Sequence, residues 1–119
     1  MTVRDTQRLL DCEVICGDDL LDAEVASGCG ADLMSDVLRF IKPNGVLLTG
    51  STSASAIRAA EMTGVRAIVY VRGKQPQDEA VSLARKRGIP LLTTQLLMFE
   101  SCGRLHAAGL QGGSECEGE

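Results

Sequence analysis

Gly45-Val-Leu-Leu-Thr-Gly-Ser-Thr-Ser-Ala-Ser55 is an apolar run that ends in a threonine and a glycine and then continues into hydroxyl side chains. The apolar half predicts a buried strand over Val46–Thr49, Gly50 predicts a tight turn, and the hydroxyl-rich half predicts a helix that begins near Ser53. A glycine turn before a helix exposes backbone N–H groups at the positive end of the helix dipole, where an anion can bind. The stretch contains no pair of nucleophile and base, so it predicts binding and not catalysis.

Downstream of this stretch, the alternation of strand and helix repeats twice. The predicted elements are helix Ser53–Thr63, strand Ala67–Val71, helix Gln77–Arg87, strand Pro90–Thr93 and helix Gln95–Ala108. The first two helices stop at Gly64 and Gly88, which can take the left-handed conformation at a helix C-terminus. Successive strand–helix units predict a parallel sheet, because parallel strands need a crossover connection.

The chain before residue 45 adds further elements to this sheet. They are a helix through Leu10 capped by Thr2, a strand Cys12–Cys16, a weaker strand around Glu24–Gly28, and a helix over Ala31–Ile41 capped by Asp32. The predicted fold class is therefore α/β, with a mostly parallel sheet and flanking helices. Residues 1–110 are predicted to form a single domain, and residues 111–119 a disordered acidic tail.

Composition excludes several classes of protein. The 119 residues are 45% hydrophobic, which suits one core, and the net charge of −4 comes with no cluster of Lys or Arg between aromatic residues. Nucleic acid is therefore not expected as a partner. No apolar run approaches the roughly 20 residues that span a membrane. The N-terminus also lacks an apolar signal region, so we expect a cytoplasmic protein without a membrane partner.

The cysteines do not form a metal-binding pattern. The chain contains Cys12, Cys16, Cys29, Cys102 and Cys116, with no Cys-x-x-Cys pair and only one histidine, His106. A zinc or iron–sulfur site needs three or four such ligands together. We therefore expect small buried thiols and neither a metal site nor a cofactor, while a redox or metal role for Cys12, Cys16 and Cys29 stays open.

Three predicted strands end in residues that suit an anionic ligand. These residues are Gly50, Ser51, Thr52 and Ser53 after the first strand, Arg72 and Gly73 after the second, and Thr93 and Thr94 after the third. Parallel strands present their carboxyl ends at one edge, where ligands bind, and a guanidinium there suits phosphate or carboxylate. The simpler alternative is that the hydroxyl groups only cap helices and that Arg72 is a solvated loop charge. No catalytic residue is expected.

The segment from Leu20 to Phe40 is more apolar than one strand and one helix require. Some of its side chains should remain outside the core, which predicts an interface and most simply a homodimer. The alternative is that the N-terminal helix covers this surface.

Several motifs give the chain a resemblance to the DRTGG-domain family from about Cys12 to Leu110. They are Gly17-Asp-Asp-Leu-Leu-Asp-Ala-Glu-Val, Ala31-Asp-Leu-Met-Ser-Asp-Val-Leu, Arg72-Gly73-Lys-x-Pro76, Gly88-Ile-Pro-Leu-Leu-x-Thr and Phe99-Glu-x-x-Gly-Arg-Leu. The resemblance implies a fold similar to the N-terminal domain of HPr kinase. It also implies a regulatory role, as in modules between the CBS domains of certain family II pyrophosphatases. The chain departs from the family name, because Ser51-Thr52-Ser53 stands where Asp-Arg-Thr is expected and Arg72-Gly73 where Gly-Gly is expected.

Together the residues and the resemblance predict a non-catalytic regulatory domain that binds a small anionic metabolite, with an adenine nucleotide as one candidate. A kinase is not expected, because the sequence has no Gly-x-x-x-x-Gly-Lys-Ser/Thr loop to cradle a triphosphate. The alternative is an adaptor, without a ligand of its own, for a redox enzyme of the hydrogenase type or for a phosphotransfer enzyme. Family members encoded beside iron-only hydrogenases suggest this second role.

Overall fold

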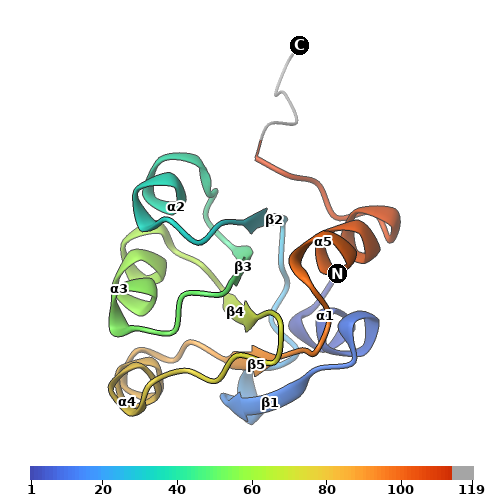
Figure 1. The fold of residues 1–119 in the computed structure, drawn as a ribbon. Helices are drawn as coiled ribbons and strands as arrows, with labels where there is room; N and C mark the ends of the chain where they lie inside the picture. The colour runs from blue at the N-terminus through green and yellow to red at the C-terminus, as the bar shows by residue number, and fades with distance from the viewer. Residues whose placement is uncertain (114–119) are drawn as a thin grey trace.

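The chain folds into a sheet between two layers of helices, in a computed structural model that describes residues 1–113 (Figure 1). Its elements are α1 (Val3–Leu10), β1 (Glu13–Cys16), the 3₁₀ helix η1 (Asp18–Leu20), β2 (Ser27–Gly30), α2 (Met34–Phe40), β3 (Gly45–Thr49), α3 (Ala54–Thr63), β4 (Ala67–Tyr70), α4 (Asp78–Arg87), β5 (Leu91–Thr93) and α5 (Met98–Ala107). The predicted α/β fold class is confirmed.

The strands of the described chain form one sheet in the order β1-β5-β4-β3-β2. Strands β2, β3, β4 and β5 are parallel, and β1 pairs antiparallel with β5. The helices α2, α3 and α4 are the crossovers between the parallel strands, as the strand–helix alternation predicted. Strand β2 begins at Ser27, later than predicted, because its pairing with β3 starts opposite Gly45.

The core has two halves, one on each face of the sheet. Leu47, Ile68 and Leu91 pack beneath α2, α3 and α4, whereas Leu48, Val69 and Leu92 pack beneath α1 and α5 (Figure 1). Neighbouring residues of one strand thus enter opposite halves, because successive side chains point to opposite faces. Both faces are covered, which explains why these strands are apolar without interruption.

Local signals set most of the helix ends. Thr2 and Asp5 form a capping box at the start of α1, and Gly64 and Gly88 adopt left-handed conformations after α3 and α4, as predicted. Helix α5 starts at Met98 and not near Gln95. The chain before it is held in a turn, in which the Leu96 carbonyl accepts a hydrogen bond from the Arg72 N–H at 2.9 Å.

The chain beyond α5 returns to the sheet. The Gly28 N–H donates to the Gln111 carbonyl at 2.8 Å, and Gly112 forms a parallel bridge with Gly28. Residues 111 and 112 therefore contact strand β2 in the described structure, while the predicted division into a domain up to residue 110 and a tail stays a prediction. Residues 114–119 of the predicted tail lie outside the described residues. In residues 1–113, no helix is both long enough and apolar enough to span a bilayer.

Candidate functional site

The turn between β3 and α3 has the predicted conformation of a helix N-terminus. The Thr49 hydroxyl accepts a hydrogen bond from the Ser51 N–H at 3.0 Å, and the Ser53 hydroxyl caps α3 by accepting from the Ser55 N–H at 3.3 Å. The hydroxyl groups of Ser51 and Thr52 make no recorded hydrogen bond within residues 1–113. The turn therefore offers two hydroxyl groups at the positive end of the α3 dipole.

Arg72 lies beside this turn, at the end of the neighbouring strand β4. Arg72 and Gly73 both have left-handed conformations, with φ of 61° and 68°, and the Lys74 N–H donates to the Val71 carbonyl at 3.2 Å. This is a type I′ turn, whose first central position is unfavourable for a residue with a side chain. Backbone bonds hold the turn in place, because the Gly73 N–H also donates to the Thr94 carbonyl at 2.8 Å.

The Arg72 guanidinium lies against the backbone of Gly50. A Cβ atom added to Gly50 would collide with Nη2 of Arg72, so the glycine permits this close approach. In the described part of the chain, the guanidinium has no recorded hydrogen bond or ion pair. An exposed guanidinium without a partner next to free hydroxyl groups can bind an anion in a charge-assisted manner. The structure thus brings Gly50, Ser51, Thr52, Ser53, Arg72 and Gly73 together at one edge of the sheet.

Asp32 also belongs to this edge, and its predicted role as a helix cap is wrong. It was predicted to cap the helix that follows β2, but α2 begins only at Met34, with Leu33 at its N-cap and no side-chain cap bond. The Asp32 carboxylate instead accepts hydrogen bonds from the Gly50 N–H at 2.7 Å and the Thr49 hydroxyl at 3.4 Å. Its position just after β2, next to β3 in the sheet, is the sequence signal that could have indicated this contact.

Thr93 and Thr94 lie apart from this surface. Both are buried, and their hydroxyl groups donate to backbone carbonyls, from Thr93 to Lys74 at 2.8 Å and from Thr94 to Leu10 at 2.6 Å. These bonds hold the β4–α4 turn against β5 and α1 against the sheet. Both threonines support the position of the Arg72 turn. Because their hydroxyl groups already donate hydrogen bonds to the backbone, these donors are not available to a ligand.

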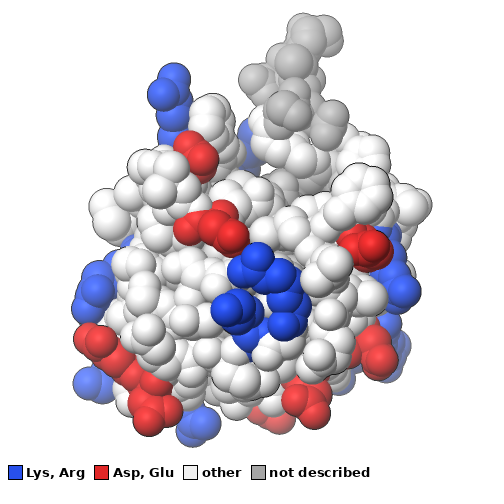
Figure 2. Space-filling view, in the orientation of Figure 1, with Lys and Arg blue, Asp and Glu red and all other residues white. Residues whose placement is uncertain are grey.

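The electrostatics of this edge are mixed. Figure 2, viewed in the orientation of Figure 1, shows basic side chains at the centre of one face with acidic side chains next to them. Arg72 and Lys74 are the exposed cations of the β4–α4 turn, and Asp32 is the exposed acid at the end of β2. A ligand with an anionic group and neutral hydroxyl groups would match both signs, because a carboxylate accepts hydrogen bonds from hydroxyl groups.

The free cysteines of the described chain are not activated for nucleophilic chemistry. Burial raises the pKa values of the Cys16, Cys29 and Cys102 thiols, and that of Cys12 to about 12, so the nucleophilic thiolate is disfavoured. Within residues 1–113, no group of three or more His, Cys, Asp or Glu side chains is arranged to hold a metal ion. The described thiols are therefore not activated as nucleophiles.

A family profile described as the DRTGG domain matches residues 5–108. The chain belongs to the DRTGG-domain family. The DRTGG fold also occurs in a solved crystal structure of the CBS and DRTGG domains of the regulatory region of Clostridium perfringens pyrophosphatase, complexed with the activator diadenosine tetraphosphate. The likeness has a TM-score of 0.70 at 16% identity and covers 87% of this chain.

This chain spans 45% of the length of the Clostridium structure. At 16% identity, the likeness shows that the fold is shared. No curated protein matches the sequence significantly. The predicted resemblance to the DRTGG family is confirmed, whereas the finer likeness to the N-terminal domain of HPr kinase stays a prediction.

Proposed function

We propose that this DRTGG domain is a non-catalytic regulatory domain that binds a small anionic metabolite at the carboxyl ends of β3 and β4. The observation that carries the proposal is the unpaired Arg72 guanidinium beside Gly50 and the N-terminus of α3. A guanidinium, free hydroxyl groups and a helix N-terminus are the donors that phosphate groups use in proteins.

An adenine nucleotide is our candidate ligand. The solved DRTGG-containing structure has diadenosine tetraphosphate as its activator, which supports a nucleotide for a member of the same family. Asp32 also suits this ligand, because its carboxylate lies next to the proposed phosphate site and can accept hydrogen bonds from ribose hydroxyl groups. Neither the family match nor the solved structure supports the alternative of an adaptor without a ligand.

Calorimetric titration with a panel of nucleotides tests this function. Arg72→Ala should weaken the binding of a phosphorylated ligand by about 1.5–3 kcal/mol, the range for hydrogen bonds to charged groups. Arg66→Ala is the matched control, because Arg66 is an exposed arginine just before β4 whereas Arg72 follows the same strand. Equal affinity of the wild type and Arg72→Ala for every bound nucleotide would remove Arg72 from the site.

If the domain is purely regulatory, the purified protein should not hydrolyse ATP or pyrophosphate. The support is chemical. Burial raises the pKa values of the described thiols, and within residues 1–113 no group of three or more His, Cys, Asp or Glu side chains is arranged to hold a metal ion. Phosphate release that grows with protein concentration, in the presence of magnesium, would contradict a purely regulatory role. A cytoplasmic location also remains part of this proposal.

Self-association is the second part of the proposal. In the segment from Leu20 to Phe40, α1 covers Leu21 and Val25, while three side chains of the α2 region stay exposed. These are Leu33 at 62%, Leu38 at 45% and Phe40 at 56% exposure. An apolar surface of this kind on α2 favours an interface, and a twofold homodimer is the simplest arrangement that covers it.

A further inference from the structure

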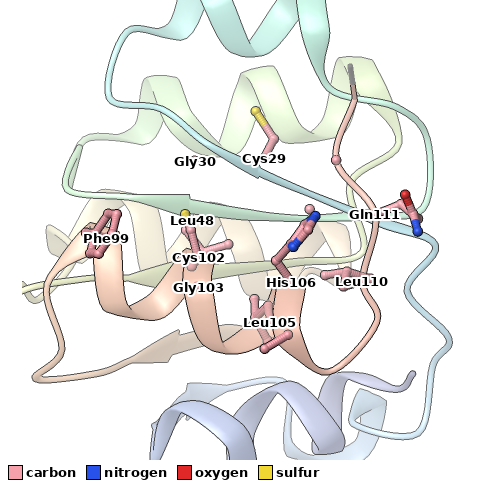
Figure 3. Close-up of a pocket in the computed structure, with 13 residues that line it drawn as sticks. Cys29, Gly30, Leu48, Phe99, Cys102, Gly103, Leu105, His106, Leu110 and Gln111 are labelled. Carbon is pink, nitrogen blue, oxygen red and sulfur yellow. The ribbon is translucent and has the colours of Figure 1, made fainter. Parts of the chain in front are cut away.

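A groove of about 420 Å³ runs between strand β2 and helix α5 (Figure 3). Leu48, Leu105, Leu110 and Cys102 make much of its wall apolar, and its volume lies within the usual range for small-molecule sites. Phe99 lies at one end of the groove, and the residue is 85% exposed. An exposed aromatic ring at the mouth of an apolar groove provides a surface on which a flat ring can stack.

Gly103 keeps the α5 side of the groove open. It lies within α5 and lines the groove, and a Cβ atom added there would meet no atom within 4 Å. Glycine is among the least favourable residues inside a helix, and no neighbouring atom of the described chain requires it here. The space that Gly103 leaves is therefore not explained by packing within the domain.

Gly30 provides polar groups on the opposite wall. Strand β2 lies at the edge of the described sheet, and its alternate residues turn their backbone groups away from β3. The outward N–H of Gly28 is bonded to Gln111, whereas the outward N–H and carbonyl of Gly30 have no recorded partner within residues 1–113. One free donor and one free acceptor beside an apolar groove match the edge of a purine ring, which carries both.

The groove and the strand-end site share the carboxyl end of β2. Gly30 pairs with Leu48, two residues before Gly50, so normal strand spacing places Gly30 and Gly50 roughly 8 Å apart. Asp32 follows Gly30 closely and already contacts Gly50. Figure 3 shows Phe99 at the end of the groove toward which β2 and β3 point, and His106 toward the other end. A ribose can span the separation between a ring in the groove and a phosphate beside Gly50.

We propose that the groove between β2 and α5 binds the adenine base of a nucleotide whose phosphates bind at Gly50–Ser53 and Arg72. The base stacks on Phe99, fills the space beside Gly103 and pairs with the backbone of Gly30. This inference rests on the proposed function, because it places the second half of the same ligand.

Calorimetric titrations of the full chain with ADP and with pyrophosphate test the base site separately from the phosphate site. Phe99→Ala and Gly103→Leu should each weaken ADP about tenfold and leave pyrophosphate unchanged, because they remove the stacking ring or fill the groove. Arg72→Ala should weaken both ligands. Met62→Ala and Ser82→Leu are the controls, since they make similar changes at exposed positions of α3 and α4.

The outcomes separate the two proposals. In the first outcome, ADP binds to the wild type, Arg72→Ala weakens this binding, and both groove variants bind ADP as tightly as the wild type. The base site is then wrong and the proposed function stands. Equal affinity of the wild type for ADP and pyrophosphate would also overturn the base site alone. If neither ligand binds to the wild type, the adenine nucleotide of the proposed function is wrong and so is the base site. Phe99→Ala removes only exposed surface, so its result does not depend on how Gly103→Leu folds.

Discussion

Gly50→Ala should impair ligand binding almost as strongly as the loss of Arg72, and it should do so without unfolding the domain. The φ angle of Gly50 lies outside the left-handed range, so alanine can adopt its backbone conformation. The new methyl group would collide with Nη2 of Arg72 and lie only 3.0 Å from its Cζ, at the far end of a flexible side chain. The guanidinium must therefore move away, while the backbone and the core remain in place.

The expected loss of affinity is about 1.5–3 kcal/mol, since displacement removes the same charge-assisted hydrogen bonds as truncation of Arg72. Calorimetric titration with ADP measures this loss, and urea unfolding should give a free energy of unfolding within about 0.5 kcal/mol of the wild type. The double variant with Arg72→Ala should bind no more weakly than either single variant, because both remove one interaction. Additive losses in the double variant would refute the reasoning, as would full affinity in Gly50→Ala.

Three further predictions concern stability and association. The Tyr70 hydroxyl is buried and has no hydrogen-bond partner among the described residues. Tyr70→Phe should therefore leave the free energy of unfolding in urea unchanged or raise it by about 1 kcal/mol. A decrease of more than about 1 kcal/mol would indicate that the hydroxyl has a partner. The domain should lose stability above about pH 9, because burial raises the pKa of Cys12 from 9.0 to about 12 in the folded state. The contribution of the Cys12 thiol to the free energy of unfolding is therefore constant below pH 9 and falls toward pH 12 by at most about 1.4 kcal/mol per pH unit. Cys12→Ala should make the pH dependence of the free energy of unfolding less steep in denaturation under reducing conditions, while Cys16, Cys29 and Cys102, whose pKa values burial also raises, keep part of it. Sedimentation equilibrium should give twice the chain mass of 12.6 kDa. Phe40→Glu, which places a charge on the exposed apolar surface of α2, should shift the protein toward the monomer. A wild-type protein that stays monomeric at all micromolar concentrations would exclude the dimer.

The local architecture around the site could be predicted from the sequence. The run Gly45–Ser55 indicated β3, the Gly50 turn and a helix capped by Ser53, and Gly64 and Gly88 indicated where α3 and α4 end. The motifs also indicated the DRTGG family, which the family profile confirms. Such features depend on backbone preferences within a few residues, so neighbouring side chains suffice to reveal them.

Only the tertiary structure decided which side chains lie at the proposed ligand-binding edge of the sheet. Asp32 was expected to cap a helix nearby, but the adjacent strand places the Gly50 N–H within its reach. Thr93 and Thr94 lie at the end of strand β5 as expected. Their hydroxyl groups, however, donate to backbone carbonyls, that of Thr93 to the β4–α4 turn and that of Thr94 to the end of α1. The groove between β2 and α5 likewise joins segments about 70 residues apart. Each of these partners comes from a distant part of the chain, so no local pattern of residues could specify the contact.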